Sequence, residues 1–253
     1  MSLFDLISRE GTIRCINLLE REDRYSSSQE IFSQLGLKVN YLRVSRHPQG
    51  GVRGCFESHI QCLTEAYDAG AKYCLVFEDD AIPSSGYDLE TLDHVKTFIQ
   101  SRDDWDLFYL GSYPQIFKER AQKVSPSIVK FQGYNTHAYI ASRRWMEQVK
   151  DLEFTGTPID VYYSGNAESY GCYPAQFIQS LSESDIDPST LVNPSLRQSY
   201  YRGVEAYAYH INIPLNLLLV LLVVGVIFLY LGYPAEVILI LATIVALAII
   251  VNL

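Results

Sequence analysis

The chain has 253 residues, a formal net charge of −9 and 19 tyrosines. An acidic balance argues against nucleic acid as a partner, because nucleic-acid binding needs a basic face, and the length suits one α/β domain with a sizeable core. The 5 cysteines form no CxxC pair, which argues against a zinc site and is typical of reduced core thiols. Residues 1–14 contain charges and no apolar run of signal length, so no secretory signal is expected.

The N-terminal part of the chain has the pattern of alternating strands and helices. A strand is expected over 12–18 and a helix over 26–35, where Ser26 and Gln29 would form a capping box. A second strand is expected over 37–44. Strand, helix and strand within about 30 residues form a βαβ unit, so we expect a largely parallel sheet.

A glycine-rich, basic loop over 45–54 comes next, before a helix with apolar residues at helical spacing. Glycines together with Arg46 and Arg53 before a helix N-terminus could form a cradle for an anion. An ordinary mobile surface loop would have the same composition. The sequence leaves both interpretations open.

Three adjacent carboxylates, Glu78, Asp79 and Asp80, follow the apolar run 74–77, which predicts the end of a buried strand. Unpaired carboxylates are costly to bury and repel one another, and a divalent cation with oxygen ligands relieves both effects. In an extended chain Glu78 and Asp80 point to one side and Asp79 to the other, so the first and third could share a metal ion. The alternative is an acidic turn in solvent.

The remaining patterns continue the alternation of strands and helices to the end of the domain. We expect this domain to comprise residues 1–205. Asp88 is expected to cap a helix, because its side chain can accept a backbone N–H. The other expected elements are strands over 106–111, 128–131, 137–142 and 171–177, a helix over 143–152 and a short helix or turn from 158. The strands over 128–131 and 137–142 are expected to be antiparallel or mixed.

Residues 206–253 have the pattern of a membrane anchor with two transmembrane helices. The segments 211–231 and 235–253 are almost wholly apolar, and each is about as long as a bilayer is thick. Gly232-Tyr233-Pro234 separates them, and tyrosines lie at both ends of the first segment, as is typical of membrane interfaces. Two arginines precede the hairpin and none lies at its turn, which indicates a domain on the cytoplasmic side. A buried helical hairpin of a soluble protein is the alternative.

Several motifs, in order between residues 13 and 186, resemble glycosyltransferase family 25, which contains bacterial lipooligosaccharide galactosyltransferases and the collagen galactosyltransferases. The motifs are Ile16-Asn17-Leu18 with Arg21, Asp23 and Arg24, Gly54-Cys55-Phe56-Glu57-Ser58-His59, Glu78-Asp79-Asp80, residues 106–111, Tyr139-Ile140-Ala141-Ser142, Pro158-Ile159-Asp160 and Ser184-Asp185-Ile186. The resemblance implies a domain similar to GT-A nucleotide-sugar transferases, with a mostly parallel central sheet flanked by helices. It also implies a UDP-sugar donor, UDP-galactose or UDP-glucose, and Mn²⁺ or Mg²⁺.

On this basis we expect Asp80 to be the principal metal ligand, with Glu78 as a second or water-mediated ligand. Asp79 is expected to contact the ribose or sugar of the donor. The other residues expected to bind the donor are Asn17, Leu18, Arg21 and Arg24 in the first turn, and Arg53, Ser58 and His59 beside it. Arg21 and Arg24 could instead form ion pairs with Asp23.

The resemblance also implies an inverting reaction, in which a carboxylate base takes the proton of the acceptor hydroxyl in a single displacement. Asp160 is the first candidate for this base, Asp185 the second and His137 the third. A structural alternative exists for Asp160, because an acidic residue at a helix N-terminus is stabilised by the helix dipole.

The sequence therefore predicts a membrane-anchored, metal-dependent transferase that moves a hexose from a UDP-sugar to a hydroxyl of a glycan, a lipid-linked glycan or a protein. A metal-dependent phosphoesterase would also use clustered carboxylates, but it usually needs further ligands for a second metal, and the 5 histidines are scattered. A catalytically inactive nucleotide-sugar-binding protein on a membrane is the third possibility.

Overall fold

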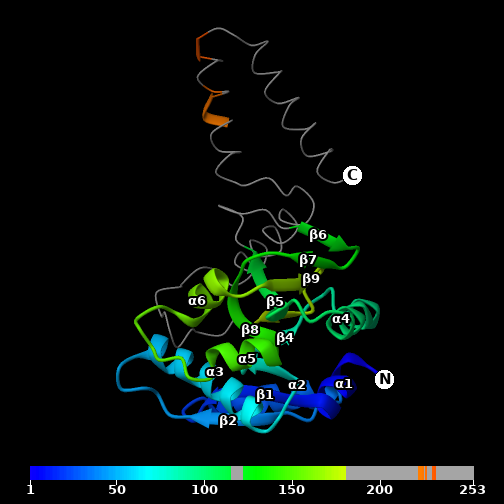
Figure 1. Ribbon diagram of the computed structural model, residues 1–253. Coiled ribbons are helices and arrows are strands. Elements are labelled where there is room, and N and C mark those ends of the chain that lie inside the picture. Colours follow the sequence, from blue (N-terminus) through cyan, green and yellow to red (C-terminus); the bar gives the residue numbers. More distant parts are fainter. Residues whose placement is uncertain (115–121, 181–221, 225, 227–229, 232–253) are drawn as a thin grey trace.

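The computed structural model describes residues 1–114, 122–180, 222–224, 226 and 230–231 (Figure 1). Its helices in the domain are α1 (Leu3–Glu10), α2 (Glu22–Gln34), α3 (Gly51–Asp68), α4 (Leu89–Ser101), α5 (Arg143–Val149) and α6 (Ile159–Asn166). Its strands are β1 (Gly11–Leu18), β2 (Asn40–Val44), β3 (Tyr73–Glu78), β4 (Ala81–Pro83), β5 (Leu107–Pro114), β6 (Gln122–Ser125), β7 (Ile128–Lys130), β8 (Gly133–Ser142), β9 (Ser169–Cys172) and β10 (Phe177–Gln179).

Within the described residues, one eight-stranded sheet in the order β2-β1-β3-β8-β5-β9-β7-β6 forms the centre of the domain. β1 pairs in parallel with β2 and β3, and β5 pairs in parallel with β9, whereas the other pairs are antiparallel. Followed across the sheet, six strands run in one direction and only β7 and β8 run in the other. The predicted α/β class with a mostly parallel sheet is confirmed, and so is the antiparallel pairing expected for residues 128–131 and 137–142.

The strand β3 shows why the sheet is covered on both faces. Tyr73, Leu75 and Phe77 belong to a core formed with α1, α2 and α4, whereas Cys74 and Val76 belong to a second core formed with α3, α5 and α6. Successive side chains of a strand point to opposite faces, so an unbroken apolar run is buried on both sides. The next residue in this alternation, Glu78, is therefore directed toward the face covered by α3.

The start of the chain differs from the prediction in two places. α2 begins at Glu22 and not at the expected capping box, because Glu22 and Asp23 in its first turn already stabilise the helix dipole. An unpredicted helix, α1, precedes β1, and a capping box between Ser2 and Asp5 marks its start. This amphipathic helix buries its apolar residues against β1, β3 and α4.

The C-terminal part of the domain contains more strands than predicted. β9 and β10 replace the single strand expected over 171–177, since Pro174 lies between them and cannot donate a hydrogen bond to a ladder. β10 pairs with the short strand β4, whose last residue is Pro83. This two-stranded sheet tolerates Pro83 at its edge. It also carries Gln179 next to the end of β3.

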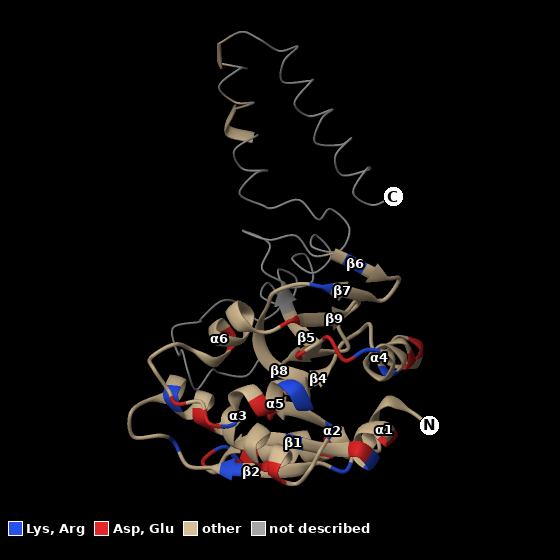
Figure 2. Cartoon of the chain, in the orientation of Figure 1, with Lys and Arg blue, Asp and Glu red and all other residues tan. Residues whose placement is uncertain are grey.

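The predicted membrane segments, 211–231 and 235–253, lie almost entirely outside the described residues. The described part of the first segment includes helical residues 222–224, and most of its described apolar side chains are exposed, with Leu222 at 60% and Tyr230 at 90%. Figure 2 shows charged residues distributed over the domain, whereas these tail residues carry none. Among the described residues, no helix combines the length and the apolar character needed to span a membrane.

Candidate functional site

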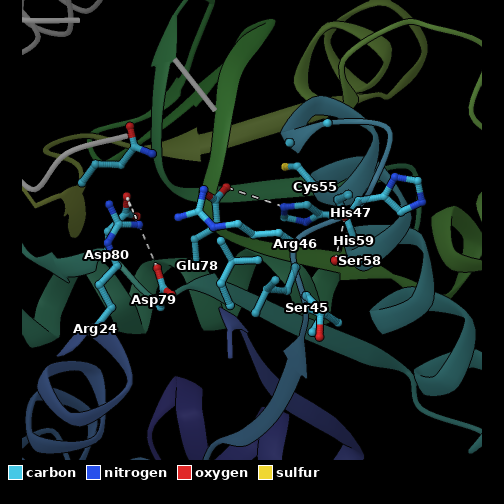
Figure 3. A pocket seen from close by; sticks show the side chains of 17 residues that line it. Arg24, Ser45, Arg46, His47, Cys55, Ser58, His59, Glu78, Asp79 and Asp80 are labelled. Carbon is cyan, nitrogen blue, oxygen red and sulfur yellow. Dashed lines mark hydrogen bonds and ion pairs between the residues drawn. The ribbon is translucent and has the colours of Figure 1, made fainter. Parts of the chain in front are cut away.

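A cavity of about 280 Å³ lies at the carboxyl ends of β1, β2 and β3, next to the start of α3 (Figure 3). Ligands of α/β proteins usually bind at this edge of the sheet, because helix N-termini and loops converge there. Polar side chains that line the cavity include Arg24, Arg46, Ser58, His59, Glu78, Asp79, Asp80 and Gln179. The predicted glycine-rich loop and the predicted acidic motif therefore meet in one cavity.

Glu78, the last residue of β3, lies on the α3 side of the cavity. Thr136 donates a hydrogen bond of 2.9 Å to Glu78 Oε1, and His59 Nε2 lies 3.6 Å from the same oxygen. His59 Nδ1 is 3.0 Å from the hydroxyl of Tyr139, which fixes the orientation of the ring. Burial alone would raise the pKa of Glu78, but the contacts with His59 and Thr136 outweigh it and hold that pKa below its ordinary value.

Asp79 and Asp80 lie on the opposite side of the cavity, against Arg24. The Arg24 guanidinium is 3.1 Å from Asp79 Oδ1 and 3.6 Å from Asp80 Oδ2. The expectation that Glu78 and Asp80 point to the same side is wrong, because β3 ends at Glu78 and the next two residues form a turn. The side-chain alternation of an extended chain therefore stops before Asp80.

Asn17 connects the first strand to the acidic motif. Its amide donates hydrogen bonds of 2.7 Å to Asp79 and 3.2 Å to the carbonyl of Arg21, and it accepts one of 3.0 Å from Arg43. Burial raises the pKa of Asp79, although the hydrogen bonds from Asn17 and Arg24 oppose this shift. The predicted family motif around Asn17 thus supports the end of β3 directly.

The two arginines of the first turn have different partners. Arg21 pairs with Asp23 through two hydrogen bonds, 3.0 and 2.9 Å long, which lower the pKa of Asp23 to about 2. Arg24 reaches into the cavity and pairs with the acidic motif. Leu18 lines the cavity beside it. The sequence left open whether Arg21 and Arg24 bind the donor or pair with Asp23. The structure pairs Arg21 with Asp23, whereas Arg24 pairs with the acidic motif.

The glycine-rich loop forms the wall of the cavity opposite the first turn. Gly50 precedes α3 with a φ of 102°, a backbone conformation that side chains with a Cβ rarely adopt. Arg46 and Ser58 line the cavity, and the hydroxyl of Ser58 donates a hydrogen bond to the carbonyl of Gly54. Arg53 does not line it, since its guanidinium is directed at Glu57 and Gln49.

The first candidate for the base, Asp160, lies in the first turn of α6 and outside the cavity lining. Its Oδ1 accepts a hydrogen bond of 2.8 Å from the N–H of Val161, and its Oδ2 accepts one of 3.4 Å from Asn135. Asn135 has a φ of 67°, and its side chain donates a hydrogen bond of 2.9 Å to Gln179 in the cavity wall. Asp160 is thus linked to the cavity through Asn135 and Gln179.

The other two candidates differ in position. Asp185 lies outside the described residues. His137 is buried, and its Nε2 lies 3.3 Å from the carbonyl of Phe177. Burial lowers the pKa of His137 and so favours the neutral ring, although the nearby charge of Glu78 opposes this shift.

The carboxylate side chains that line the cavity are chemically suited to a divalent cation, because carboxylate oxygens are the ligands that Mg²⁺ and Mn²⁺ prefer. In the parts of the chain that the structure describes, however, no three acidic, histidine or cysteine side chains converge in a group that could hold a metal. The guanidinium of Arg24 instead lies between Asp79 and Asp80 and supplies a positive charge there. The residues fit a metal ion provided that Arg24 gives up one of these carboxylates.

Thr136, Asn135 and Gln179 were not predicted from the sequence. Gln179 lines the cavity because β10 returns to β4, and Thr136 reaches Glu78 because β8 lies beside β3. Pairing of Phe77 with Ala138 brings the end of β3 next to Thr136. No local pattern in the sequence indicates the register of β8 against β3. For Asn135 a local signal exists, because asparagine is one of the few residues that tolerate a positive φ.

Comparison with known proteins shows which family the chain represents. The model of "Glycosyltransferase family 25 (LPS biosynthesis protein)" matches residues 15–161, and no curated protein matches the chain. The chain is similar to a glycosyltransferase involved in glycosylation of the major capsid of PBCV-1, with 11% identity, coverage of 76% of this chain and 100% of that one, and a TM-score of 0.42. It is also similar to a UDP-glucose pyrophosphorylase complexed with UDP-glucose, with 10% identity, coverage of 67% and 74%, and a TM-score of 0.39.

A putative glucose-1-phosphate thymidylyltransferase from Bacillus anthracis is similar as well, with 15% identity, coverage of 58% and 60%, and a TM-score of 0.34. These similarities are too distant to carry an argument about this chain. The family match is different, because it spans more than half of the 253 residues and includes the motifs around Asn17, His59 and Asp80. The protein is therefore a glycosyltransferase that belongs to family 25.

Proposed function

We propose that the protein transfers a hexose, galactose or glucose, from a UDP-sugar to a hydroxyl of a glycan, a lipid-linked glycan or a protein, with inversion and with the help of Mn²⁺ or Mg²⁺. The observation that carries this proposal is the cavity at the ends of β1, β2 and β3. It combines the carboxylates of the β3 end with Arg46 and the glycine-rich start of α3. A metal-bound nucleoside diphosphate needs both kinds of group.

The donor's parts can be assigned to opposite walls of this cavity. The backbone at Ile16 and Leu18 would contact the nucleoside, since these residues line the cavity at the end of β1. Arg46 and the first N–H groups of α3 would hold the diphosphate, because free helix N–H groups and arginine both favour phosphate oxygens. His59 and Ser58, which line the α3 side, would then lie near the sugar.

The acidic residues would have separate roles in this arrangement. Asp80 would be the principal metal ligand, and Glu78, held by Thr136 and His59, would contact the ion directly or through water. A bound divalent ion neutralises the charge that develops on the departing UDP. Asp79 would remain with Asn17 and support the turn, close enough to the cavity to meet the donor ribose.

Transfer also needs a base on the acceptor side. The hydroxyl oxygen of the acceptor would form a bond to the anomeric carbon while the bond to UDP breaks on the opposite face, and Asp160 would accept the hydroxyl proton. The link from Asp160 through Asn135 to Gln179 supports a position beside the reacting end of the donor. Asp185 is the second candidate.

The apolar tail would hold this domain at a bilayer. The segments 211–231 and 235–253 have the length and composition of membrane helices. The exposed apolar side chains at 222, 223 and 226 support this function, since such a surface is unfavourable in water. The arginines before the hairpin favour a cytoplasmic domain, close to membrane-bound acceptors.

Calorimetric titration with UDP, in the presence and absence of Mn²⁺, tests the proposed donor and metal. We expect UDP to bind, and to bind more tightly with Mn²⁺ present, because a divalent cation would offset the repulsion between the carboxylates and the diphosphate. A phosphoesterase would instead hydrolyse a phosphate ester without selecting the uridine nucleotide. Failure of UDP to bind under both conditions would contradict the proposal.

A further inference from the structure

His47 connects the glycine-rich loop to the start of α3. Its backbone carbonyl accepts a hydrogen bond of 3.0 Å from the N–H of Gly50, and its side-chain Nδ1 accepts one of 3.1 Å from the N–H of Gln49. Its Nε2 lies 3.4 Å from Oε2 of Glu57, in the second turn of α3. His47 lines the cavity, and its side chain is only 23% exposed.

The sequence His47-Pro48-Gln49-Gly50 favours the turn that these contacts stabilise, which we call the His47 turn. Proline presets the backbone for the second position of a β-turn, and glycine is favoured at the fourth. The ring nitrogen of His47 adds a hydrogen bond to the backbone two residues further on, as asparagine and aspartate side chains commonly do in turns. Because Gly50 leads directly into α3, the His47 turn sets where this helix begins.

The His47 turn also packs closely against the first turn of α3. A Cβ added to Gly54 would lie 2.9 Å from the Cβ of His47, which is closer than such atoms normally approach. The N–H of Gly54 donates a hydrogen bond of 3.2 Å to the carbonyl of Gly50. Figure 3 shows the His47 ring beside this part of α3. A displacement of the turn would therefore displace the start of the helix.

The start of α3 is the part of the site to which the function proposed above assigns the diphosphate. The first N–H groups of a helix lack intrahelical partners and favour phosphate oxygens. Gly50, Gly51 and Gly54 line the cavity there, and without side chains they allow a close approach to the backbone. The nucleoside would lie elsewhere, at the end of β1. A change in the His47 turn should thus affect binding of the diphosphate and leave the nucleoside unaffected.

We propose that His47 is a positioning residue for the donor diphosphate: its Nδ1 stabilises the His47 turn, and the turn holds the start of α3 at the cavity wall. This inference rests on the proposed function and adds a residue that shapes the phosphate side of the site. The effect of His47 passes through the backbone N–H of Gln49. A histidine that contacted phosphate directly would act through its other nitrogen, Nε2.

Two substitutions separate the two nitrogens of His47. His47→Asn places an amide oxygen close to the position of Nδ1, so it can still accept the N–H of Gln49. His47→Gln extends to the position of Nε2 and keeps a polar group there, but it loses the hydrogen bond within the turn. A positioning role therefore favours UDP binding by the asparagine variant, whereas direct contact with phosphate favours the glutamine variant.

The test measures binding of UDP by calorimetry and of uridine by nuclear magnetic resonance titration, on the full chain with Mn²⁺ present. His47→Ala should weaken UDP binding by about three- to tenfold, the equivalent of one hydrogen bond. His47→Gln should lose a similar factor, and His47→Asn should recover most of the loss. Affinity for uridine should be the same in all three variants and the wild type, because uridine has no diphosphate.

His94→Ala is the matched control, because Nδ1 of His94 also forms one hydrogen bond, 3.0 Å from Oγ of Ser127, and His94 does not line the cavity. It should leave both affinities unchanged. The inference is overturned if His47→Gln binds UDP at least as tightly as His47→Asn, or if His47→Ala weakens binding of uridine and UDP equally. If the wild type does not bind UDP, the proposed function itself fails, so the two failures can be distinguished.

Gly54→Ala gives an independent result if His47→Ala does not fold. The added methyl group would meet the Cβ of His47 and displace the His47 turn without removing any of its hydrogen-bonding groups. We expect weaker binding of UDP and unchanged binding of uridine. UDP binding as tight as that of the wild type would contradict a positioning role for the turn.

Discussion

Three adjacent carboxylates have three different surroundings in this protein. Glu78 faces Thr136 and His59 across the floor of the cavity, and Asp79 is fixed by Asn17. Asp80 makes the weaker of the two contacts with Arg24. The difference arises because the strand ends at Glu78, so that the next two residues turn toward α2. The three carboxylates of the acidic motif therefore differ in their partners although they are adjacent in the sequence.

Asp160→Asn should lower transfer by about 10²–10⁴-fold, because the amide cannot accept the proton of the acceptor hydroxyl. Binding of UDP should stay unchanged, since Asp160 does not line the cavity. The measurements are turnover and UDP affinity on the same preparation. Asp151→Asn, at an exposed ion pair with Lys150, is the control, and unchanged turnover in Asp160→Asn would remove Asp160 from the mechanism.

Asn17→Ala should destabilise the fold by about 1–3 kcal/mol, since it removes one hydrogen bond from the largely buried Asp79 carboxylate and one from the Arg43 side chain. Urea unfolding gives the free energy of unfolding directly. Asn40→Ala is a suitable control, because the side chain of Asn40 makes only an exposed contact of 3.5 Å with Thr12, and its effect should stay within about 0.5 kcal/mol. Equal effects of the two substitutions would show that Asn17 does not support the acidic motif.

At the scale of elements, α2 positions the cavity through both of its ends. Its first turn carries Arg24 into the cavity, while Phe32 near its C-terminus packs against Phe77 of β3 with ring centroids 4.8 Å apart. The helix begins at Glu22, before the predicted capping box, and this start brings Arg24 into the first turn. A helix beginning at Ser26 would have left Arg24 in the preceding loop.

Asp23→Asn tests the charge at this helix start through its pH dependence. The pKa of Asp23 is lowered in the folded state to about 2, so its stabilising contribution is complete above the ordinary value of 3.8 and is lost as pH falls through about 2. The variant should be less stable than the wild type at pH 7 by less than about 1 kcal/mol, because the pair is exposed. The difference should vanish near pH 2 in thermal unfolding, and a constant difference would contradict this account.

Sequence patterns predicted the elements whose signals are local. The apolar run before Glu78 predicted β3 and its burial, and Asp88 accepts the backbone N–H of Thr91 as expected of a helix cap. The neighbours of Glu78 were beyond prediction, because Thr136 depends on the register of β8 against β3. The different partners of Arg21 and Arg24 also depend on a helix start that local propensity placed four residues too late.

At the scale of the whole molecule, the domain and the apolar tail have contrasting surfaces. Charges cover the described domain, whereas the described residues of the tail expose apolar side chains such as Leu222 and Val226 (Figure 2). A glycosyltransferase tethered to a bilayer would meet acceptors that are themselves membrane-bound. The described residues that line the cavity all lie between Ile16 and Gln179, within the domain.

Extraction of membranes with alkaline carbonate tests the proposed anchor. The full chain should remain in the membrane pellet, because two apolar segments of bilayer length hold it there. A variant with lysines at Leu222 and Val226 should be released at least in part, since charges in the middle of a membrane helix are unfavourable. Release of the unaltered chain into the supernatant would contradict the proposal.

The proposed transfer from a UDP-sugar depends on a divalent metal ion and on the carboxylates at the end of β3. Its most direct test is release of UDP from a panel of UDP-sugars, measured with Mn²⁺ and after chelation, for the wild type and Asp80→Asn. We predict release from UDP-galactose or UDP-glucose by the wild type with Mn²⁺, and a loss of that release after chelation and in Asp80→Asn. Equal release with and without the ion, or by Asp80→Asn, would contradict the account.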